Sequence, residues 1–173
     1  MLTRKRFVLL LPLLLAVQPA WAAFSDGVTA YTSGQYNKAY NIFRSIAETT
    51  HDKSTPLAEY WLGMMYLHGQ GVKPDYSKAS EWFMKAAKKN LPQAQYQLGT
   101  LYFNGKGVPR DYERAYAWYR VAALHKHELS MKALPRAKEN LSSTELKDAE
   151  KLSREYIEKY ATKKKDKQGK NQQ

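Results

Sequence analysis

The sequence predicts an all-α fold in which antiparallel helix pairs stack side by side as a solenoid. A stretch of 36 residues recurs without a gap, since residues 58–93 and 94–129 share fourteen identical positions. Apolar residues recur every three or four positions within each copy, which is the spacing of an α-helix, and no segment has the pattern of a strand. They form two stripes on nearly opposite sides of the first helix, so stacked neighbours must cover both sides.

Residues 1–22 are expected to be a signal peptide, because their pattern is that of an export signal. Basic residues at 4–6 are followed by an apolar run of eleven residues, and then by the small residues Ala20 and Ala22. We place cleavage after Ala22 and expect the mature protein in the periplasm of a Gram-negative bacterium, or secreted. A membrane anchor is the alternative reading, but the run is shorter than the ~20 residues that span a bilayer.

The charge distribution separates a basic tail from a single domain. The formal net charge of +12 falls to +9 without residues 1–22, and +4 of that belongs to residues 163–173. This Lys-rich tail has no apolar residue to bury and is predicted to be disordered. Residues 23–162 remain as a helical repeat domain, with a net charge of +5 and enough length for one core. The chain has no cysteine, so it has neither a disulfide nor a lipid-attachment cysteine.

The first unit of the repeat domain, at about residues 24–55, is a shorter form of the repeated pattern. Its helical signature runs from Gly27 to Ala47, with a turn about five residues tighter than in the later copies. Terminal repeats of a stack are commonly atypical, because one of their faces meets solvent. We therefore expect this unit to be the N-terminal helix pair.

The two closely matching units follow at about residues 56–91 and 92–127. In the first of them, Thr55 has the position of an N-cap and precedes Pro56, which predicts a helix that starts near Leu57. The two stripes of that helix are Ala58, Leu62 and Tyr66 on one side, and Tyr60, Met64 and Leu67 on the other.

A Gly-x-Gly turn at residues 69–71 ends this helix, because glycine adopts left-handed backbone angles without steric cost. Asp75 then has the N-cap position of a second helix, whose small and aromatic face includes Ala79 and Trp82. The positions that we predict to be structural in the two copies are Gly63, Gly69, Gly71, Asp75, Gly99, Gly105, Gly107 and Asp111.

The last unit, residues 128–162, is predicted to be a helical cap. One helix is expected from Leu129 to Leu141 despite Pro135. Ser142 and Glu145 have capping-box spacing and should start another. The apolar stripe of that helix is Leu146, Ala149, Leu152, Tyr156 and Tyr160. Together with the three pairs before it, the cap brings the total to about eight helices.

The repeated residues resemble a known family. Each close copy contains Ala-x-x-x-Leu-Gly-x-x-Tyr-x-x-Gly-x-Gly-Val, followed by Asp, Lys-Ala or Arg-Ala, Trp and Ala-Ala. This pattern is similar to the Sel-one-like repeat (SLR), a relative of the tetratricopeptide repeat. The resemblance implies a right-handed superhelix whose concave wall, lined by the first helix of each repeat, binds an extended peptide or a partner's helix. The chain departs from the family at Asn90 and Lys126, where a glycine usually ends the second helix.

Carried over by position, this wall supplies eight partner-binding candidates. They are Tyr60, Met64, Leu67 and His68 in one repeat, and Tyr96, Thr100, Phe103 and Asn104 in the next. In the alternative reading, Tyr60 and Tyr96 only pack against neighbouring helices, since they are identical in the two copies. The positions where the copies differ include Met64/Thr100 and His68/Asn104. Packing demands neither residue type there, so we expect these positions to determine specificity.

No arrangement of residues in the sequence points to catalysis, a cofactor or a metal. The pair His125-x-His127 lacks a third ligand at a useful spacing, and both histidines are expected on the surface at a helix C-terminus, where the dipole favours them. Asp75 and Asp111 lie a full repeat apart, so they do not form a pair of acids for sugar hydrolysis. Cell-wall or β-lactam chemistry, ascribed to cysteine-rich relatives, gains no support from a chain without cysteine.

The function expected from the sequence is therefore that of a periplasmic scaffold or adaptor that binds a protein or peptide and is not an enzyme. The alternative is charge-mediated binding of the Lys-rich tail to an anionic membrane or cell-wall surface; otherwise the tail is a solvated end that aids solubility. Nucleic acid is not an expected partner, because export separates the protein from it. The sequence leaves the oligomeric state and the identity of the partner open.

Overall fold

A computed structural model of the chain describes residues 20–161, which form eight α-helices and one short π-helix, without a β-strand. The prediction of an all-α repeat fold is therefore confirmed. Residues 1–19 and 162–173 lie outside the described part of the chain, and with them most of the predicted signal peptide and the Lys-rich tail. The proposed cleavage position after Ala22 falls inside the first helix, α1.

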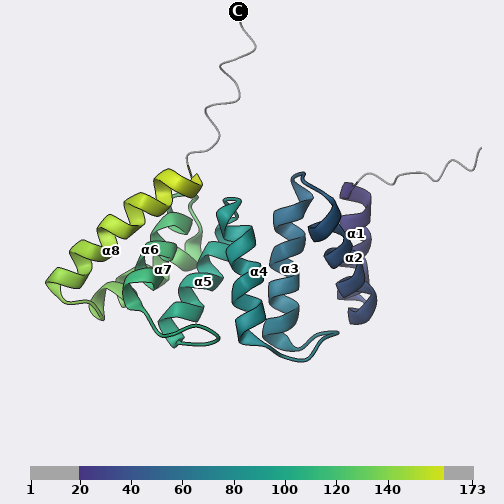
Figure 1. The fold of residues 1–173 in the computed structure, drawn as a ribbon, viewed down its shortest axis with the longest axis horizontal. Coiled ribbons are helices and arrows are strands. Elements are labelled where there is room, and N and C mark those ends of the chain that lie inside the picture. The colour runs from purple at the N-terminus through teal and green to yellow at the C-terminus, as the bar shows by residue number, and fades with distance from the viewer. Residues whose placement is uncertain (1–19, 162–173) are drawn as a thin grey trace, which may run out of the picture.

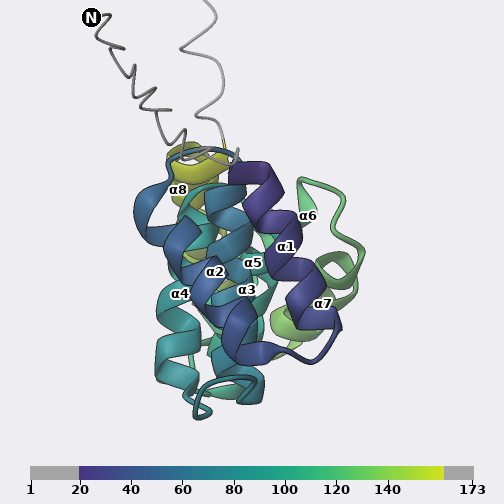
Figure 2. The same cartoon turned by 90° about the vertical axis from the view of Figure 1, so that its right-hand side faces the viewer.

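Three helix pairs follow one another along the long axis of the molecule (Figure 1). They are α1 (Ala20–Thr32) with α2 (Tyr36–Thr49), α3 (Ser54–His68) with α4 (Tyr76–Lys88), and α5 (Pro92–Asn104) with α6 (Tyr112–Ala123). The second helix of each pair also packs on the first helix of the next, α2 on α3 and α4 on α5. Figure 2 views this stack from the end that α1 and α2 form. Helices α3 and α5 are thus covered from both sides, as their two apolar stripes require.

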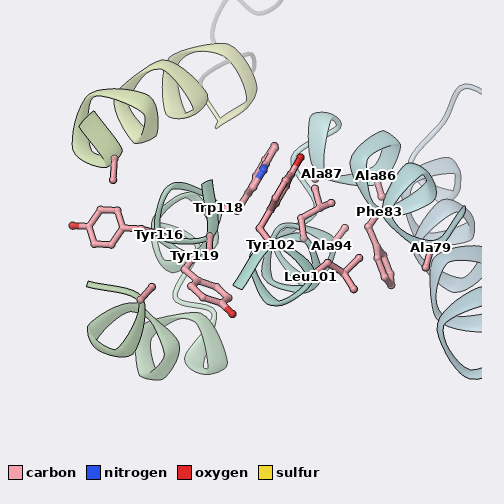
Figure 3. Packing of buried hydrophobic residues seen from close by; sticks show 14 residues of the cluster. Ala79, Phe83, Ala86, Ala87, Ala94, Leu101, Tyr102, Tyr116, Trp118 and Tyr119 are labelled. Atoms are coloured by element: carbon pink, nitrogen blue, oxygen red, sulfur yellow. The ribbon is translucent and has the colours of Figure 1, made fainter. Parts of the chain in front are cut away.

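The last two helices, α7 (Glu128–Glu139) and α8 (Ser143–Tyr156), do not continue this arrangement. Both pack on α6, and α7 also contacts α5. Figure 3 shows α6 between the other two. Helix α7 contains Pro135 and ends two residues before the expected Leu141, because Asn140 and Leu141 form a tight turn before Ser142 caps α8. The C-terminal cap is therefore two separate helices on either side of α6.

Aspartate side chains start the second helix of both close repeats. Oδ1 of Asp75 accepts a hydrogen bond from the backbone N–H of Lys78 at 2.9 Å, and Oδ1 of Asp111 accepts one from that of Arg114 at 2.8 Å. Each carboxylate satisfies an amide that has no partner within the helix, and the positive end of the helix dipole stabilises its charge.

The start of α3 differs from the sequence prediction, which was wrong about Thr55 as the N-cap. Helix α3 begins at Ser54, and the backbone N–H of that residue donates to Oδ1 of Asp52 at 2.8 Å. An ionised carboxylate is a stronger acceptor than a hydroxyl, so Asp52 fixes the first turn. Thr55 is buried, and its hydroxyl donates to the carbonyl of Thr50 at 3.0 Å. Pro56 lies in the first turn, where its missing N–H costs no helical hydrogen bond.

Two glycines let the helices of each close pair approach one another. A Cβ atom on Gly63 would lie 2.5 Å from the ring of Phe83, and one on Gly99 would lie 2.6 Å from the ring of Tyr119. Such distances are shorter than any van der Waals contact, so a larger residue would push the helices apart. At both crossings, an aromatic ring of the second helix occupies the space that the glycine leaves.

The core consists of two hydrophobic clusters. One lies among α1 to α4 and includes the fully buried Phe43 and Leu62. The other continues from α4 to α8 and includes Phe83 and Trp118 (Figure 3). Alanines contribute many of its buried positions, which allows close contact between helices while the rings fill the remaining space.

Asn90 and Lys126, which stand where the family usually has glycine, both have left-handed backbone angles, with φ of 64° and 58°. Asn90 compensates for this conformation, because its Oδ1 accepts a hydrogen bond from Nε2 of Gln95 at 3.2 Å. The exposed Lys126 has no comparable side-chain bond in the described part of the chain. A side chain with a Cβ costs about 1 kcal/mol in this conformation.

Replacing Lys126 by glycine should therefore raise the free energy of unfolding by about 1 kcal/mol, because glycine removes the backbone strain. Urea unfolding followed by circular dichroism measures the change. Asn90→Gly is the matched control at the equivalent position, and it should gain less because it also loses the Gln95 hydrogen bond. A loss of stability in Lys126→Gly would contradict the role of the backbone angle.

Candidate functional site

A hollow between α5 and α7 brings together four of the predicted partner-binding residues. The α5 side chains are three or four residues apart, so they share one face of that helix. A second stripe with similar spacing on α7 faces them. Tyr119 of α6 lies between the two stripes. The hollow encloses about 290 Å³ and is lined by Tyr96, Thr100, Phe103, Asn104, Tyr119, Leu129, Lys132, Ala133 and Arg136. We call it the α5–α7 hollow.

Tyr119 fixes the floor of the α5–α7 hollow. Its ring packs on Gly99, and its hydroxyl donates a hydrogen bond to Oγ1 of Thr100 at 3.2 Å. The rings of Tyr96 and Tyr119 lie with their centroids 5.7 Å apart. Burial raises the pKa of Tyr119, so this hydroxyl stays protonated and remains a donor at neutral pH. The α5 side of the hollow is therefore preorganised.

The α7 side of the hollow is cationic and partly apolar. The guanidinium of Arg136 lies 4.9 Å from the ring centroid of Phe103, within the range of a cation–π contact. None of the lining residues is acidic, and neither Lys132 nor Arg136 forms an ion pair within residues 20–161. Leu129 is 52% exposed, which is high for a leucine beside an aromatic wall. The hollow thus offers both unpaired positive charge and uncovered apolar surface.

The four candidates of the preceding repeat do not line the α5–α7 hollow. Tyr60, Met64 and Leu67 are half-buried against the core, and His68 is exposed at the end of α3. The ring of Tyr60 packs on Phe83 with centroids 5.8 Å apart. Nε2 of Gln97 on α5 contacts the sulfur of Met64 at 3.7 Å. Tyr60 thus packs on α4 as Tyr96 packs on α6, and α5 contacts this wall at Met64.

His127 has a role that the sequence prediction of a surface histidine at a helix C-terminus missed. It is the N-cap of α7, and its Nδ1 accepts a hydrogen bond from the backbone N–H of Ser130 at 3.3 Å. Its ring lies against Tyr96, with centroids 5.2 Å apart. Helix α6 ends at Ala123, and the left-handed residue Lys126 lies directly before His127, at the start of α7. The exposed His125 lies in the turn before it.

Stability should fall as the pH drops below the ordinary histidine range, because burial lowers the pKa of His127, while Glu128 opposes this shift. The folded protein then binds fewer protons than the unfolded chain, so the His127 contribution is present above about pH 6.5 and is lost as pH falls through the lowered pKa. Urea unfolding at about pH 7.5 and about pH 5.5 tests this. His127→Asn keeps a capping acceptor without titrating, and it should lose less stability over this interval than the wild type. Equal losses would refute the assignment to His127.

A second hollow, of about 580 Å³, lies where the turns before α3 and α5 meet. It is lined by His51, Asp52, Lys53, Thr55, Pro56, Lys89 and Asn90. Nζ of Lys89 also donates to Glu59, which is only 3% exposed. Burial raises the pKa of Glu59, and the contact with Lys89 opposes that shift. The equivalent residue in the next repeat is Gln95, also buried, which donates to the carbonyl of Ala87 at 3.2 Å.

The described residues contain neither a group suited to metal binding nor a helix that could cross a membrane. Within residues 20–161, no three His, Cys, Asp or Glu side chains are grouped as metal binding would require. In the same range, every helix is too short or too polar to traverse a bilayer.

The α7 side of the hollow was not among the predicted partner-binding residues. Leu129, Lys132, Ala133 and Arg136 have spacings of three and four residues, and so share one helix face. This signal was available, but residues 128–162 were interpreted only as a cap. Glu59 and Gln95 were also missed, although each stands beside a core alanine and so has the register of a buried face.

Comparisons with known proteins agree with the helical repeat fold. Residues 56–91 and 92–127 each match the family described as Sel1 repeat. Among solved structures, the chain is similar to a protective antigen of uropathogenic Escherichia coli that displays an SLR fold. The identity is 35% and the TM-score 0.77, over 84% of this chain and 31% of that chain. A Sel1 repeat protein from Oxalobacter formigenes is 26% identical with a TM-score of 0.61, over 78% of this chain and 54% of the other.

The chain spans less than two thirds of either of these relatives, and no curated protein matches it. Sel1 repeat proteins generally serve as scaffolds for protein–protein interaction. The sequence resemblance is confirmed by the two matched repeats and by the fold that they share with solved structures. The chain thus contains two Sel1 repeats, at residues 56–91 and 92–127.

Proposed function

We propose that this protein is an exported scaffold that binds a segment of a protein or peptide partner in the α5–α7 hollow. The observation that carries the proposal is the convergence of Tyr96, Thr100, Phe103 and Asn104 with the half-exposed Leu129 on one preorganised hollow. Binding sites of this kind combine apolar surface with a few fixed polar groups. The general role of Sel1 repeats as interaction scaffolds supports the same conclusion.

Peptide selection with the full chain, followed by calorimetric affinity measurement, tests whether the hollow binds a partner. Leu129→Ser removes exposed apolar surface without changing charge, and we expect it to weaken binding of selected peptides about tenfold, because covering a leucine contributes roughly 1.5–3 kcal/mol. Leu124→Ser is the matched control, since Leu124 is 55% exposed but does not line the hollow. Equal affinities of both variants and the wild type would refute the proposed site.

Export is supported by the basic, apolar and small-residue segments of residues 1–22. It is tested by expressing the full chain in a Gram-negative host and measuring the intact mass of the protein released by osmotic shock. The expected mass is that of a chain that begins at Ala23. An uncleaved chain retained in the cytoplasm would contradict export.

A further inference from the structure

We infer that the α5–α7 hollow selects a partner segment in which an acidic residue lies within about three positions of an apolar residue. This inference rests on the proposed function and adds the chemistry of the ligand. Lys132 and Arg136 supply two positive charges one helical turn apart on the face of α7 that lines the hollow. No acidic side chain lines the hollow to neutralise them. A bound carboxylate would supply that missing countercharge.

The contact with Phe103 orients Arg136 for this role. Its guanidinium lies against the ring at 4.9 Å, and a stacked guanidinium can still donate hydrogen bonds from its edge. The planar donors of arginine match the two oxygens of a carboxylate. Arg136 also acts electrostatically on the Tyr119 hydroxyl, whose pKa it lowers against the larger effect of burial. The positive charge of Arg136 thus acts at the floor of the hollow, where a ligand carboxylate can enter.

The apolar requirement comes from Leu129. It lies on the same face of α7 as the two cations, is 52% exposed, and borders the hollow beside the aromatic α5 wall. An apolar ligand side chain would cover this surface. Along the α7 axis, Leu129 is about 4.5 Å from Lys132 and about 10 Å from Arg136. An extended peptide advances about 3.3 Å per residue, so these distances correspond to one to three positions in the ligand.

The charge of the whole domain favours the same ligand. Residues 23–162 have a formal net charge of +5, which attracts acidic segments and repels basic ones. Local and overall charge therefore act in the same direction.

Synthetic peptides with blocked termini provide the test, titrated into the full chain by calorimetry and by chemical-shift mapping. Gly-Ser flanks carry one of four cores: Leu-Glu-Gly-Glu, Leu-Gln-Gly-Gln, Gly-Glu-Gly-Glu or Leu-Lys-Gly-Lys. We expect the first core to bind at least about tenfold more tightly than the others, with shifts at the α5–α7 hollow. Lys132→Glu plus Arg136→Glu should abolish this preference. Lys138→Glu plus Lys147→Glu changes the net charge equally at exposed positions outside the hollow and should retain it.

The outcomes separate the ligand inference from the proposed site. Equal binding of the Glu and Gln cores, weakened alike by Leu129→Ser, would overturn the acidic preference and leave the hollow as a peptide site. Equal weakening by the two double variants would assign the preference to general charge and would also overturn the inference. Shifts confined to other parts of the chain, insensitive to Leu129→Ser, would refute the hollow itself. Circular dichroism and thermal unfolding confirm that each variant is folded.

Discussion

Replacing Gly107 by alanine should lower the free energy of unfolding by about 2–4 kcal/mol, for two reasons that add. The backbone at Gly107 is left-handed, with φ of 71°, which disfavours any residue with a Cβ. That Cβ would also lie 2.2 Å from the carbonyl carbon of Tyr76, the first residue of α4. Backbone atoms at the start of a capped helix cannot move aside as a flexible side chain can. The loop of one repeat must therefore separate from the preceding repeat.

Gly34 supplies the control for the backbone effect alone. Its φ is 74°, but a Cβ there would meet no atom within 4 Å. Gly34→Ala should therefore cost only about 1 kcal/mol, the cost of the left-handed conformation. Urea unfolding of both variants measures the difference, which is the contribution of close approach between repeats. If the two variants lose the same stability, the contact between Gly107 and Tyr76 does not restrain the stack.

Removing the side chain of Trp118 should lower the free energy of unfolding by about 3–5 kcal/mol, the usual loss for a large aromatic residue in a core. Trp118 is 1% exposed, and its ring centroid lies 4.6 Å from that of Tyr156 and 5.7 Å from that of Tyr160. Those tyrosines belong to α8 and the π-helix that follows it. Trp118→Ala should therefore loosen the C-terminal helix as well as destabilise the fold.

Trp82 has the equivalent position in the preceding repeat and provides a matched control. It is only half-buried, and the ammonium of Lys85 lies 3.8 Å from its ring centroid. Trp82→Ala should lower the free energy of unfolding by only about 1–2 kcal/mol, because the Trp82 side chain buries less apolar surface than that of Trp118. Trp118→Phe should cost less than Trp118→Ala, since the indole N–H has no hydrogen-bond partner in the described residues to lose. Chemical denaturation of all three variants gives the ranking, and equal losses for Trp118→Ala and Trp82→Ala would contradict it.

The fold could be predicted because the interactions that determine it act between residues close in the sequence. The 36-residue period and the helix stripes lie within short segments of the sequence, and the pairing of α3 with α4 and of α5 with α6 follows from them. The N-caps Asp75 and Asp111 act on amides only three residues away. The start of α3 was mispredicted because the carboxylate of Asp52 accepts from the Ser54 amide at the helix start, whereas Thr55 lies inside the helix.

Only the α5 half of the candidate site could be predicted from the sequence. Family position indicated Tyr96, Thr100, Phe103 and Asn104, and whether they bind a partner stays a prediction. The same reasoning indicated Tyr60, Met64, Leu67 and His68, which do not line the hollow. In the last close repeat, α7 faces this wall across the hollow.

The sequence by itself determined the helical repeat, its period and the caps Asp75, Asp111 and Ser142, because hydrogen bonds and helical periodicity act over a few neighbouring residues. Only the tertiary structure decided that α7 and α8 pack on opposite sides of α6, that His127 caps α7, and that Lys132 and Arg136 face the aromatic wall of α5. A hollow depends on the combined volumes and directions of side chains from three helices. No pattern within a short segment of the sequence specifies this combination.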